Sequence, residues 1–351
     1  MATLSQVSVR QNKVERHSLK QIFSPISCEL QAVDECLADI LGGGKDGAVR
    51  EVVEFLLGSP GKRIRPALVL LSTGAVAGAA RGSSVLRGVP IEVAAAVELI
   101  HMASLVHDDV IDGAAVRHHQ PSINARWGAG TAIALGDYLC SHAMAMIAEC
   151  GDPRLFAILG SDLSAMCEGE LLQVAGRTRL ARSERHCLDI VEKKTASLFG
   201  ACCEAGASVA AGEPKVRTAL QQAGVHLGIA FQILDDCRDL LSDEEDLGKE
   251  PGQDLLAGDM TLPLLYGIRY CRRGGGKRLP LAPDAVGQGE LTFISAAFRL
   301  SQAPARIRQL VESQVGRAKA HLDAVHDSDF KESLCRLIDY IAVSISDILM
   351  R

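Results

Sequence analysis

The sequence has few aromatic residues and almost no runs that resemble β-strands. Phe, Trp and Tyr make up 4% of its 351 residues, and segments that alternate Val, Ile, Thr and aromatic side chains are nearly absent. Such alternation is typical of half-buried strands, so its absence argues against a β-rich fold. Apolar residues nevertheless form 48% of the chain, which is too high for an intrinsically disordered protein. The composition favours helices that pack closely through Ala and Leu.

An excess of positive charge is also missing. The 37 Lys and Arg residues are outnumbered by 43 Asp and Glu, which gives a net charge of −6. Bulk binding of nucleic acid requires a basic surface. We therefore expect no nucleic-acid partner.

Signals for secretion and for a membrane span are absent as well. The first 20 residues lack a hydrophobic segment, and the most apolar stretch, 67–80, is short and interrupted by Ser, Thr and Gly. The Arg, Ser and Gln content at the N-terminus fits a transit peptide, but Glu15 and the mixed charge favour a plain polar tail over 1–20. Eleven scattered cysteines without a CxxC motif argue against a disulfide framework. These features predict a cytoplasmic protein.

Helical periodicity runs through almost the whole chain. Clusters of Gly, Pro and Ser separate the helical segments, and a Gly- and Arg-rich segment near 271–290 predicts an exposed loop. No internal repeat or shift in composition divides the sequence, so we predict one all-α domain over 21–351. Its expected helices are 28–41, 47–57, 63–79, 90–111, 130–149, 153–173, 183–211, 215–241, 261–270, 290–300, 304–325 and 329–349.

The first chemical signal is a group of carboxylates at the end of an apolar helical stretch. Asp108 and Asp112 are four residues apart and share one helix face, with Asp109 beside them. Like charges this close repel one another unless a cation neutralises them. Oxygen ligands suit Mg²⁺, which keeps some of its waters and usually shares its site with phosphate groups. An exposed acidic helix end is the alternative for this cluster taken alone.

The same DDxxD pattern recurs at the end of a second long apolar helix, as Asp235, Asp236 and Asp239. Two such clusters on two helices can face each other across a cavity and hold several Mg²⁺ ions between them. Chance would seldom supply both copies, each preceded by a mostly apolar stretch. Arg238 lies within the second copy, so a simple salt bridge is the alternative there.

Basic residues that suit an anionic ligand accompany both clusters. The segment GKRIRP at 61–66 places three cations beside a turn and an expected helix start. Arg binds phosphate through two hydrogen bonds and Lys binds it as a point charge. The segment does not match a Walker A loop, and a solvated basic helix start is its alternative reading. Together with Arg117 and Lys249, which follow the two acidic clusters, it indicates a Mg²⁺–diphosphate ligand.

These elements, in this order, resemble the trans-isoprenyl diphosphate synthases, and in particular the long-chain polyprenyl diphosphate synthases such as the heptaprenyl and octaprenyl enzymes. The resemblance spans most of the chain, from 61 to the helix after 263. It implies a bundle of long, mostly antiparallel helices around a central cavity, and a homodimer. The matching elements are GKRIRP at 61–66, LIHMASLVHDDVID at 99–112, Arg117, Gly169-Glu170 with Gln173, Lys194-Thr195, FQILDD at 231–236 with Asp239, and GKEPGQDLLAGDMTLP at 248–263.

The resemblance also implies a role for each matching residue. The groups that carry catalysis would be Asp108, Asp109, Asp112, Lys194, Asp235 and Asp236. The ligands of Mg²⁺, with three ions present when the allylic diphosphate is bound, would be Asp108, Asp109, Asp112, Asp235 and Asp239. The allylic diphosphate would be held by Arg117, Lys194, Thr195, Gln232 and Lys249. Isopentenyl diphosphate would be held by Lys62, Arg65, His101 and His118.

The implied reaction is a Mg²⁺-assisted ionisation, condensation and proton elimination. Loss of diphosphate from the allylic substrate gives a carbocation, which the double bond of isopentenyl diphosphate attacks. We expect the proton to leave with the departing diphosphate. An apolar tunnel beneath the charged mouth would shield the cation from water.

The sequence departs from the family pattern after Arg117. The family usually has a second arginine there, whereas this chain has His118 followed by His119. Neutral His is the weaker anion ligand, and its contribution would grow as the pH falls toward about 6.5. A zinc site at the His pair is the alternative, but adjacent side chains diverge and no third ligand is evident.

Product length can be inferred from the helix that carries Asp108. In the family, bulky aromatic residues just before the first acidic cluster act as a floor that stops chain growth. Here Ala103 and Ser104 are small, and Ile100 lies another turn below. We expect a long product, from heptaprenyl to decaprenyl, with these three residues in the chain-length pocket. Close helix packing is the alternative reason for the small residues.

Other functions remain open from the sequence alone. They are a farnesyl or geranylgeranyl diphosphate synthase with a shorter product, a class I terpene cyclase, and a non-catalytic helical subunit of a heteromeric synthase. The second DDxxD and the GKRIRP segment argue against the cyclase, and the presence of both acidic motifs argues against the subunit. A long apolar product also implies at most transient membrane contact during release.

Overall fold

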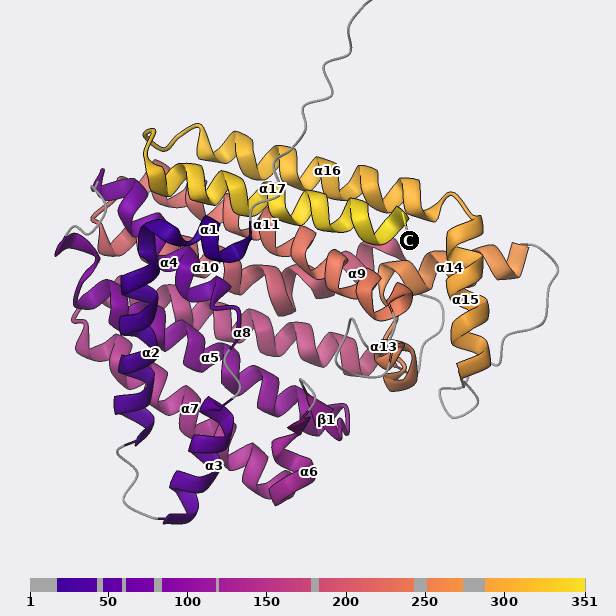
Figure 1. The fold of residues 1–351 in the computed structure, drawn as a ribbon, viewed down its shortest axis with the longest axis horizontal. Helices are drawn as coiled ribbons and strands as arrows, with labels where there is room; N and C mark the ends of the chain where they lie inside the picture. Colours follow the sequence, from indigo (N-terminus) through magenta and orange to yellow (C-terminus); the bar gives the residue numbers. More distant parts are fainter. Residues whose placement is uncertain are drawn as a thin grey trace, which may run out of the picture.

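The computed structural model describes residues 18–42, 47–58, 61–78, 84–117, 120–177, 183–242, 251–273 and 288–350. Within these ranges the chain is a bundle of long helices, which confirms the predicted all-α class (Figure 1). The helices are α1 (Leu19–Ile22), α2 (Ser27–Gly42), α3 (Gly47–Leu57), α4 (Ile64–Ala77), α5 (Val89–Ile111), α6 (Ile123–Trp127), α7 (Ala129–Glu149), α8 (Pro153–Gly176), α9 (Glu184–Val191), α10 (Ser197–Val209), α11 (Pro214–Leu241), α13 (Gln253–Ala257), α14 (Leu262–Arg273), α15 (Gln288–Leu300), α16 (Ala303–Leu322) and α17 (Asp329–Met350).

Each long helix expected from the periodicity has a counterpart. The segment expected as one helix over 183–211 is instead α9, a π-helical turn at Glu192–Ala196 and α10, in succession. The short elements were not expected: α1, α6, α13, two 3₁₀ turns at Ser24–Ile26 and Ser84–Leu86, and a hairpin of β1 (Val116–Arg117) and β2 (Gln120–Pro121). Short elements contain too few residues to show a period, which is why the sequence does not predict them.

The ends of the chain and the predicted loop lie partly outside the described residues. Residues 1–17 of the predicted polar tail are not described, while Ser18 caps α1 through a reciprocal hydrogen-bond pair with Gln21. Helix α1 packs against α17, so the N-terminal turn contacts the C-terminal helix. The loop predicted near 271–290 falls between the end of α14 and the start of α15, and residues 274–287 are not described.

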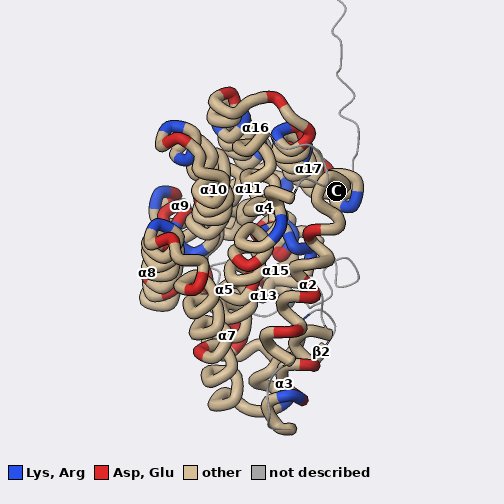
Figure 2. The backbone as a smooth tube through the Cα atoms, turned by 90° about the vertical axis from the view of Figure 1, so that its left-hand side faces the viewer, with Lys and Arg blue, Asp and Glu red and all other residues tan. Residues whose placement is uncertain are grey.

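The core is formed by α4, α5, α10 and α11, which contact one another along the centre of the molecule. Most residues of α4 and α10 are fully buried, and the buried side chains include Leu68, Leu70, Leu71 and Phe199. Figure 2 shows few charged residues along these central helices. Helices α16 and α17 run side by side over α11 at the other edge of the bundle (Figure 1). The charged ends of α5 and α11 are therefore set at the margin of a large apolar core.

Two helical segments are long and apolar enough to cross a bilayer by composition alone, residues 84–111 and 129–149. In the first, which contains α5, 67% of the most apolar window is buried inside the protein, and in the second, α7, the share is 39%. Helix α5 is accordingly a core helix of the bundle, whereas α7 turns part of its apolar surface outward.

Glycine residues allow the central helices to approach closely. A Cβ atom at Gly206 on α10 would lie 2.2 Å from the carbonyl oxygen of Val69 on α4. One at Gly224 on α11 would lie 2.5 Å from the carbonyl oxygen of Phe199 and 2.9 Å from the Cys203 Sγ on α10. These contacts are shorter than van der Waals distance and involve backbone atoms, which cannot turn aside. Glycine at these positions sets the spacing between the helices.

We predict that Gly224→Ala destabilises the protein by about 1–3 kcal/mol, because the added methyl group overpacks the contact between α10 and α11. The matched control is Gly160→Ala on α8, where a Cβ would meet nothing within 4 Å. That change should stabilise the helix by roughly 0.5–1 kcal/mol, since alanine has the higher helix propensity. Chemical denaturation measures both. Equal effects of the two substitutions would contradict this account of the packing.

Candidate active site

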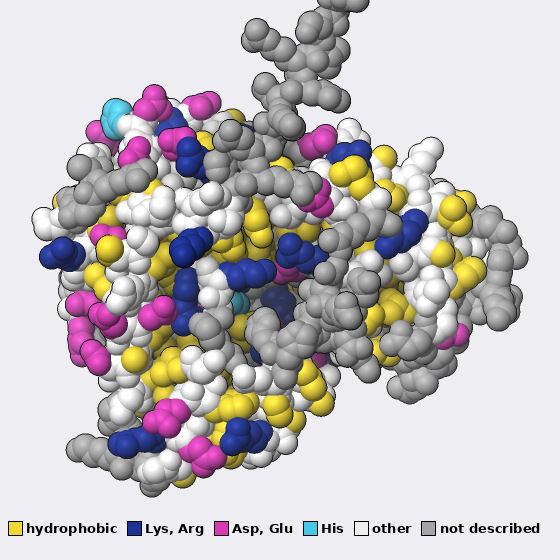
Figure 3. All heavy atoms as spheres, viewed as in Figure 1, with side chains coloured by type: hydrophobic (Ala, Val, Ile, Leu, Met, Phe, Trp, Pro, Cys, Tyr) yellow, Lys and Arg dark blue, Asp and Glu magenta, His cyan; other side chains and the backbone are white. Residues whose placement is uncertain are grey.

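A cavity of about 1440 Å³ lies where the carboxyl ends of α5, α8 and α11 meet. Figure 3 shows Lys and Arg side chains gathered around a hollow in this face of the molecule. Both acidic clusters line this one cavity, together with most of the cations and polar residues expected at the site. The expected residues that line it are Lys62, Arg65, Ile100, His101, Ser104, Asp108, Asp109, Asp112, Arg117, Gln173, Lys194, Thr195, Gln232, Asp235, Asp236 and Asp239.

Three of the residues predicted at the site are not among the described residues that line the cavity. His118 and Lys249 lie outside the described residues. Ala103 is fully buried and is not among the residues that line the cavity. It lies one position, or about 100° of helix rotation, away from Ser104, and this rotation turns it into the packed core. Of the expected chain-length residues, Ile100 and Ser104 lie on the wall.

The first cluster is ordered by the hairpin that follows α5. Arg117, on β1, donates hydrogen bonds from Nε to both oxygens of Asp109 at 2.9 Å and from Nη2 to Oδ1 at 2.7 Å. Asn124, on α6, donates to the backbone carbonyls of Asp109 and Ala114 at 3.2 and 3.1 Å. These contacts fold the chain back, so that Arg117 neutralises the buried Asp109 carboxylate.

A second cation reaches the first cluster from the π-helical turn. Lys194 forms an ion pair with Glu170 on α8 and another, at 3.4 Å, with Asp108. A Cβ at position 169 would lie 2.6 Å from the Lys194 backbone nitrogen, so Gly169 allows α8 to approach the π-helical turn. Single π-helical turns are often found at functional sites. The adjacent Gly169-Glu170 pair thus has two tasks: the glycine permits the approach and the glutamate pairs with the lysine.

The second cluster is linked to the same turn by polar side chains. Thr195 donates from Oγ1 to Gln232 Oε1 at 2.8 Å, and Gln232 donates from Nε2 to Asp236 Oδ1 at 2.8 Å. Asp239 accepts backbone N–H bonds from Gln253 and Asp254 at 3.3 and 3.1 Å, which anchors the start of α13. These contacts fix the end of α11 against the segments that surround the cavity.

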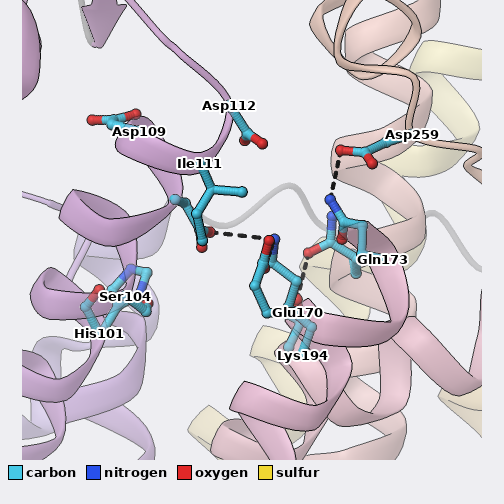
Figure 4. A network of polar contacts seen from close by, with 12 residues as sticks. His101, Ser104, Asp109, Ile111, Asp112, Glu170, Gln173, Lys194 and Asp259 are labelled. Atoms are coloured by element: carbon cyan, nitrogen blue, oxygen red, sulfur yellow. Dashed lines mark hydrogen bonds and ion pairs between the residues drawn. The ribbon is translucent and has the colours of Figure 1, made fainter. Parts of the chain in front are cut away.

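Arg177 was not expected at the site, yet it joins the ends of two helices. Its guanidinium pairs with Asp112 and forms hydrogen bonds of 2.9 Å to both oxygens of Asp259. Gln173 donates to Asp259 at 2.6 Å, and Figure 4 shows Asp112, Glu170, Gln173 and Asp259 pointing toward one another. The four-residue spacing from Gln173 to Arg177 places both on one face of α8, which is the only sequence signal for this network.

Burial raises the pKa of several carboxyl groups in the clusters. It raises the pKa of Asp108 to about 6, with Lys194 opposing the shift and Glu170 adding to it. It raises the pKa of Asp236 to about 7, and the neighbouring carboxylates of Asp235 and Asp239 add to the shift. The pKa of Asp235 is also raised by burial. The charged forms of these carboxyl groups are therefore costly to bury unless a cation accompanies them.

The donor set fits a hard divalent cation that is shared with a ligand. The oxygens are carboxylates, as Mg²⁺ prefers, and Asp236 Oδ2 is buried without a hydrogen-bond partner. Among the described residues, no three acidic, imidazole or thiol groups converge closely enough to form a complete site on their own. Arg117, Lys194 and Arg177 occupy carboxylates of the first cluster. Waters or ligand oxygens would complete the coordination of a Mg²⁺ ion here, and Mg²⁺ usually shares its site with phosphate groups.

Two further cations, Arg65 and Lys62, form a second basic group on the same cavity. Arg65 Nη1 lies 2.9 Å from His101 Nε2, and its guanidinium stacks 5.0 Å above the centre of the Phe199 ring. Lys62 is exposed and lies close enough to Asp235 to oppose the rise in its pKa. Arg117 and Lys194 thus pair with the first cluster, whereas Lys62 and Arg65 lie near Asp235 of the second, and two such groups of cations suit two separate anionic ligands.

The wall also includes apolar side chains from α7 and α8. Leu163 and Met166 on α8 line the cavity with Cys140 on α7. The aromatic residues among the described lining, Phe55 and Phe231, do not lie on α5, α7 or α8. Among the described lining residues, the apolar wall beside the charged groups thus carries no Phe, Tyr or Trp on these three helices.

Comparison with known proteins gives one consistent family. The family model described as "Polyprenyl synthetase" matches residues 46–280. Heptaprenyl diphosphate synthase component 2 of Geobacillus stearothermophilus is 36% identical over 327 residues, which covers 92% of this chain and 98% of that protein. A short chain isoprenyl diphosphate synthase of Methanothermobacter thermautotrophicus is 34% identical over 82% of this chain and 88% of its own length.

The fold comparison agrees. The crystal structure of a polyprenyl synthase from Caulobacter crescentus CB15, complexed with calcium and isoprenyl diphosphate, superposes with a TM-score of 0.86. It is 29% identical and covers 93% of this chain and 98% of that chain. The similarity extends over nearly the whole of both proteins.

A buried carboxyl group beside the basic group gives a test of the electrostatics. Asp162, on α8, is 5% exposed, and neither of its oxygens has a hydrogen-bond partner. Burial raises the pKa of this group to about 6, and the nearby Ser197 hydroxyl and Arg65 offset only part of the shift. Because the folded pKa is raised, the folded state binds the proton more tightly than the unfolded state does. The carboxylate form therefore lowers stability as the pH rises toward and above 6.

We predict that Asp162→Asn becomes more stabilising as the pH rises. Relative to wild type, its advantage in unfolding free energy should grow by roughly 2 kcal/mol between pH 4.5 and pH 7.5, since asparagine never carries the buried charge. Denaturant titrations at the two pH values measure this difference. The exposed Asp323→Asn serves as the control and should show little dependence on pH. An advantage for Asp162→Asn that is the same at both pH values would contradict the raised pKa.

Proposed function

The chain belongs to the polyprenyl synthetase family and is a prenyltransferase, and we propose that it adds isopentenyl diphosphate units to an allylic diphosphate to make a long all-trans polyprenyl diphosphate. The observation that carries this proposal is that acidic clusters at the ends of α5 and α11 line one cavity, with a group of cations near each cluster. One group suits the allylic diphosphate and the other suits isopentenyl diphosphate.

We assign the metal site to Asp108, Asp109, Asp112, Asp235 and Asp239, with three Mg²⁺ ions when the allylic diphosphate is bound. The similar Caulobacter polyprenyl synthase is complexed with calcium and isoprenyl diphosphate, which supports a divalent cation here. When bound, Mg²⁺ would supply charge stabilisation to the departing diphosphate. Arg117 and Lys194 already neutralise carboxylates of the first cluster, so both are in place to contact the diphosphate.

The residues of the chain then divide between the two substrates. Arg117, Lys194, Thr195 and Gln232 would hold the allylic diphosphate, and Lys62, Arg65 and His101 would hold isopentenyl diphosphate. Lys249 and His118 remain proposed members of the two sets. The allylic carbon–oxygen bond breaks, the double bond of isopentenyl diphosphate forms the new carbon–carbon bond, and a proton leaves to the departing diphosphate.

The proposed long product rests on the wall below Asp108. Ser104 lies one turn away from Asp108 along α5 and Ile100 another turn beyond it, and both line the cavity. A small residue at 104 leaves room for the growing chain to pass. The names of the relatives include both heptaprenyl and short-chain enzymes, so they support the reaction more strongly than the length.

We further propose a cytoplasmic homodimer that contacts membranes only transiently. None of the eleven cysteines forms a disulfide, which fits a reducing compartment. The outward apolar surface of α7, which includes Ile133, supports a helix-mediated interface. The relative named as a component 2 raises a two-component enzyme as the alternative. Activity of the purified single chain distinguishes the two, because a component that depends on a partner would be inactive alone.

The decisive experiment is product analysis by mass. We expect the purified chain, given farnesyl or geranylgeranyl diphosphate, isopentenyl diphosphate and Mg²⁺, to yield products from heptaprenyl to decaprenyl diphosphate. Asp108→Asn and Asp235→Asn should each lower kcat by roughly 100-fold or more, because each removes charge from the proposed metal site.

Other products would refute specific parts of the proposal. A product that stops at geranylgeranyl diphosphate would refute the long chain. A cyclised hydrocarbon formed from the allylic substrate alone would identify a cyclase instead. Inactivity of the single chain would favour the two-component enzyme.

Product length should respond to position 104. We predict that Ser104→Phe shortens the product, because the ring would block the wall one turn from Asp108. The matched control is Ser104→Ala, which keeps a small side chain and should leave the length unchanged. Mass analysis of both, after thermal melts show that they fold, makes the comparison. An unchanged product from Ser104→Phe would place the length-limiting residue on another helix.

A further inference from the structure

The turn that carries Lys62 and Arg65 contains a residue in an unfavourable backbone conformation. Arg63, which directly precedes α4, has φ 52° and ψ 32°, in the left-handed helical region. Residues with a Cβ atom rarely adopt this region because Cβ crowds the following carbonyl. Among the described residues, the other non-glycine residue with positive φ is Ala211, which does not line the cavity. Something must hold Arg63 in this conformation.

The Arg63 side chain is held at two points by carboxylates from two helices. Its Nε donates to Asp34 Oδ1 on α2 at 2.7 Å, and its Nη1 donates to Glu98 Oε1 on α5 at 2.6 Å. The Glu98 side chain is 4% exposed and that of Arg63 is 14% exposed. A charged pair with so little solvent is weakly screened, and loss of either partner leaves a buried charge unpaired. We call the Asp34–Arg63–Glu98 arrangement the arginine clamp.

The clamp contacts α5 next to the place where Arg65 contacts the same helix. Glu98 and His101 are three residues apart on α5 and lie on the same face of that helix. Glu98 binds Arg63, and His101 contacts Arg65 at 2.9 Å. Two neighbouring residues of α5 therefore hold the turn through side-chain contacts. Lys62, directly before Arg63, depends on the backbone direction at residue 63 for its position on the cavity wall.

The charges argue against a direct role for Arg63 in binding an anion. Two carboxylates oppose its single positive charge, so the clamp as a whole carries negative charge. A diphosphate that approached Arg63 would be repelled by Asp34 and Glu98. Both neighbouring cations differ: Lys62 is exposed on the cavity, and Arg65 contacts a His and an aromatic ring rather than a carboxylate.

We propose that Arg63 is a positioning residue for the isopentenyl diphosphate site: the arginine clamp holds the left-handed turn so that Lys62 and Arg65 present their charges to the diphosphate. This inference rests on the proposed function. It assigns roles to Asp34 and Glu98, which come from helices outside the GKRIRP segment. Loss of the clamp should weaken binding of isopentenyl diphosphate and leave binding of the allylic substrate unchanged.

Substitutions at position 63 separate the clamp from the backbone strain. Arg63→Gly removes the clamp but adopts positive φ without strain, whereas Arg63→Ala removes the clamp and keeps the strain. We expect Arg63→Gly to melt at a higher temperature than Arg63→Ala. Both variants should raise KM for isopentenyl diphosphate by about tenfold or more, while kcat and KM for the allylic diphosphate stay within about twofold. A wild-type KM for isopentenyl diphosphate in a folded Arg63→Gly would overturn the clamp.

The carboxylates distinguish positioning from direct binding by the sign of the effect. If Arg63 positions the turn, the double variant Asp34→Asn, Glu98→Gln should raise KM for isopentenyl diphosphate by about threefold or more. If Arg63 binds the diphosphate itself, the same variant frees its charge and should lower KM, which would overturn the proposal. Glu332→Gln, in an exposed pair with Arg336, is the matched control and should change neither KM.

Lys62→Ala separates the inference from the function on which it rests. An unchanged KM for isopentenyl diphosphate in Lys62→Ala would overturn the assigned site and the clamp with it. A raised KM in Lys62→Ala, together with a wild-type KM in Arg63→Gly, would overturn the clamp alone. A raised KM in both variants supports both assignments.

Discussion

The cost of burying closely spaced carboxylates is the constraint on which the rest of the site depends. Six aspartates at the ends of α5 and α11 line one cavity, and burial raises the pKa of Asp108 and Asp236 well above the usual range. The chain offsets this cost with its own cations: Arg117 on Asp109, Lys194 on Asp108, and Arg177 on Asp112. Each of these cations lies where the proposed metal ions and diphosphate would meet. Counterions of the ligand-free protein can therefore become ligands of the substrate once a divalent cation takes over the carboxylates.

Close helix packing is what places these charges at the edge of an apolar core. Gly169 lets α8 approach the π-helical turn, which brings Glu170 to Lys194, and Gly224 sets the spacing of α10 and α11. The polar chain from Thr195 through Gln232 to Asp236 then crosses between the same elements. The close helix approaches at these two glycines, which involve no charged group, thus help to set the positions of the charged side chains.

Local patterns in the sequence predicted the long helices and the spacing within each acidic cluster, because both depend on residues a few positions apart. The meeting of the clusters depends on tertiary packing, and it was expected only through the recurrence of the pattern and the family resemblance. Arg177 with Asp259, and Arg63 with Asp34 and Glu98, join residues far apart in the chain and leave no periodic signal. The sequence predicts Ala103 on the cavity wall because it is next to Ser104. One position along a helix is also a rotation of about 100°, and this rotation turns Ala103 into the core, where it is fully buried.

The residues proposed to set product length and those proposed to carry the chemistry lie along one helix, so either set can change without the other. Asp108 stands at the cavity mouth, and Ser104 and Ile100 follow at successive turns of α5 along its wall. Relatives named for heptaprenyl and for short-chain products match most of this chain at 36% and 34% identity. A difference in product that accompanies similarity over nearly the whole chain cannot come from a different fold. We propose that it arises from residues of the cavity wall, because a side chain one turn from the acidic cluster can change the available depth while the charged groups at the mouth stay in place.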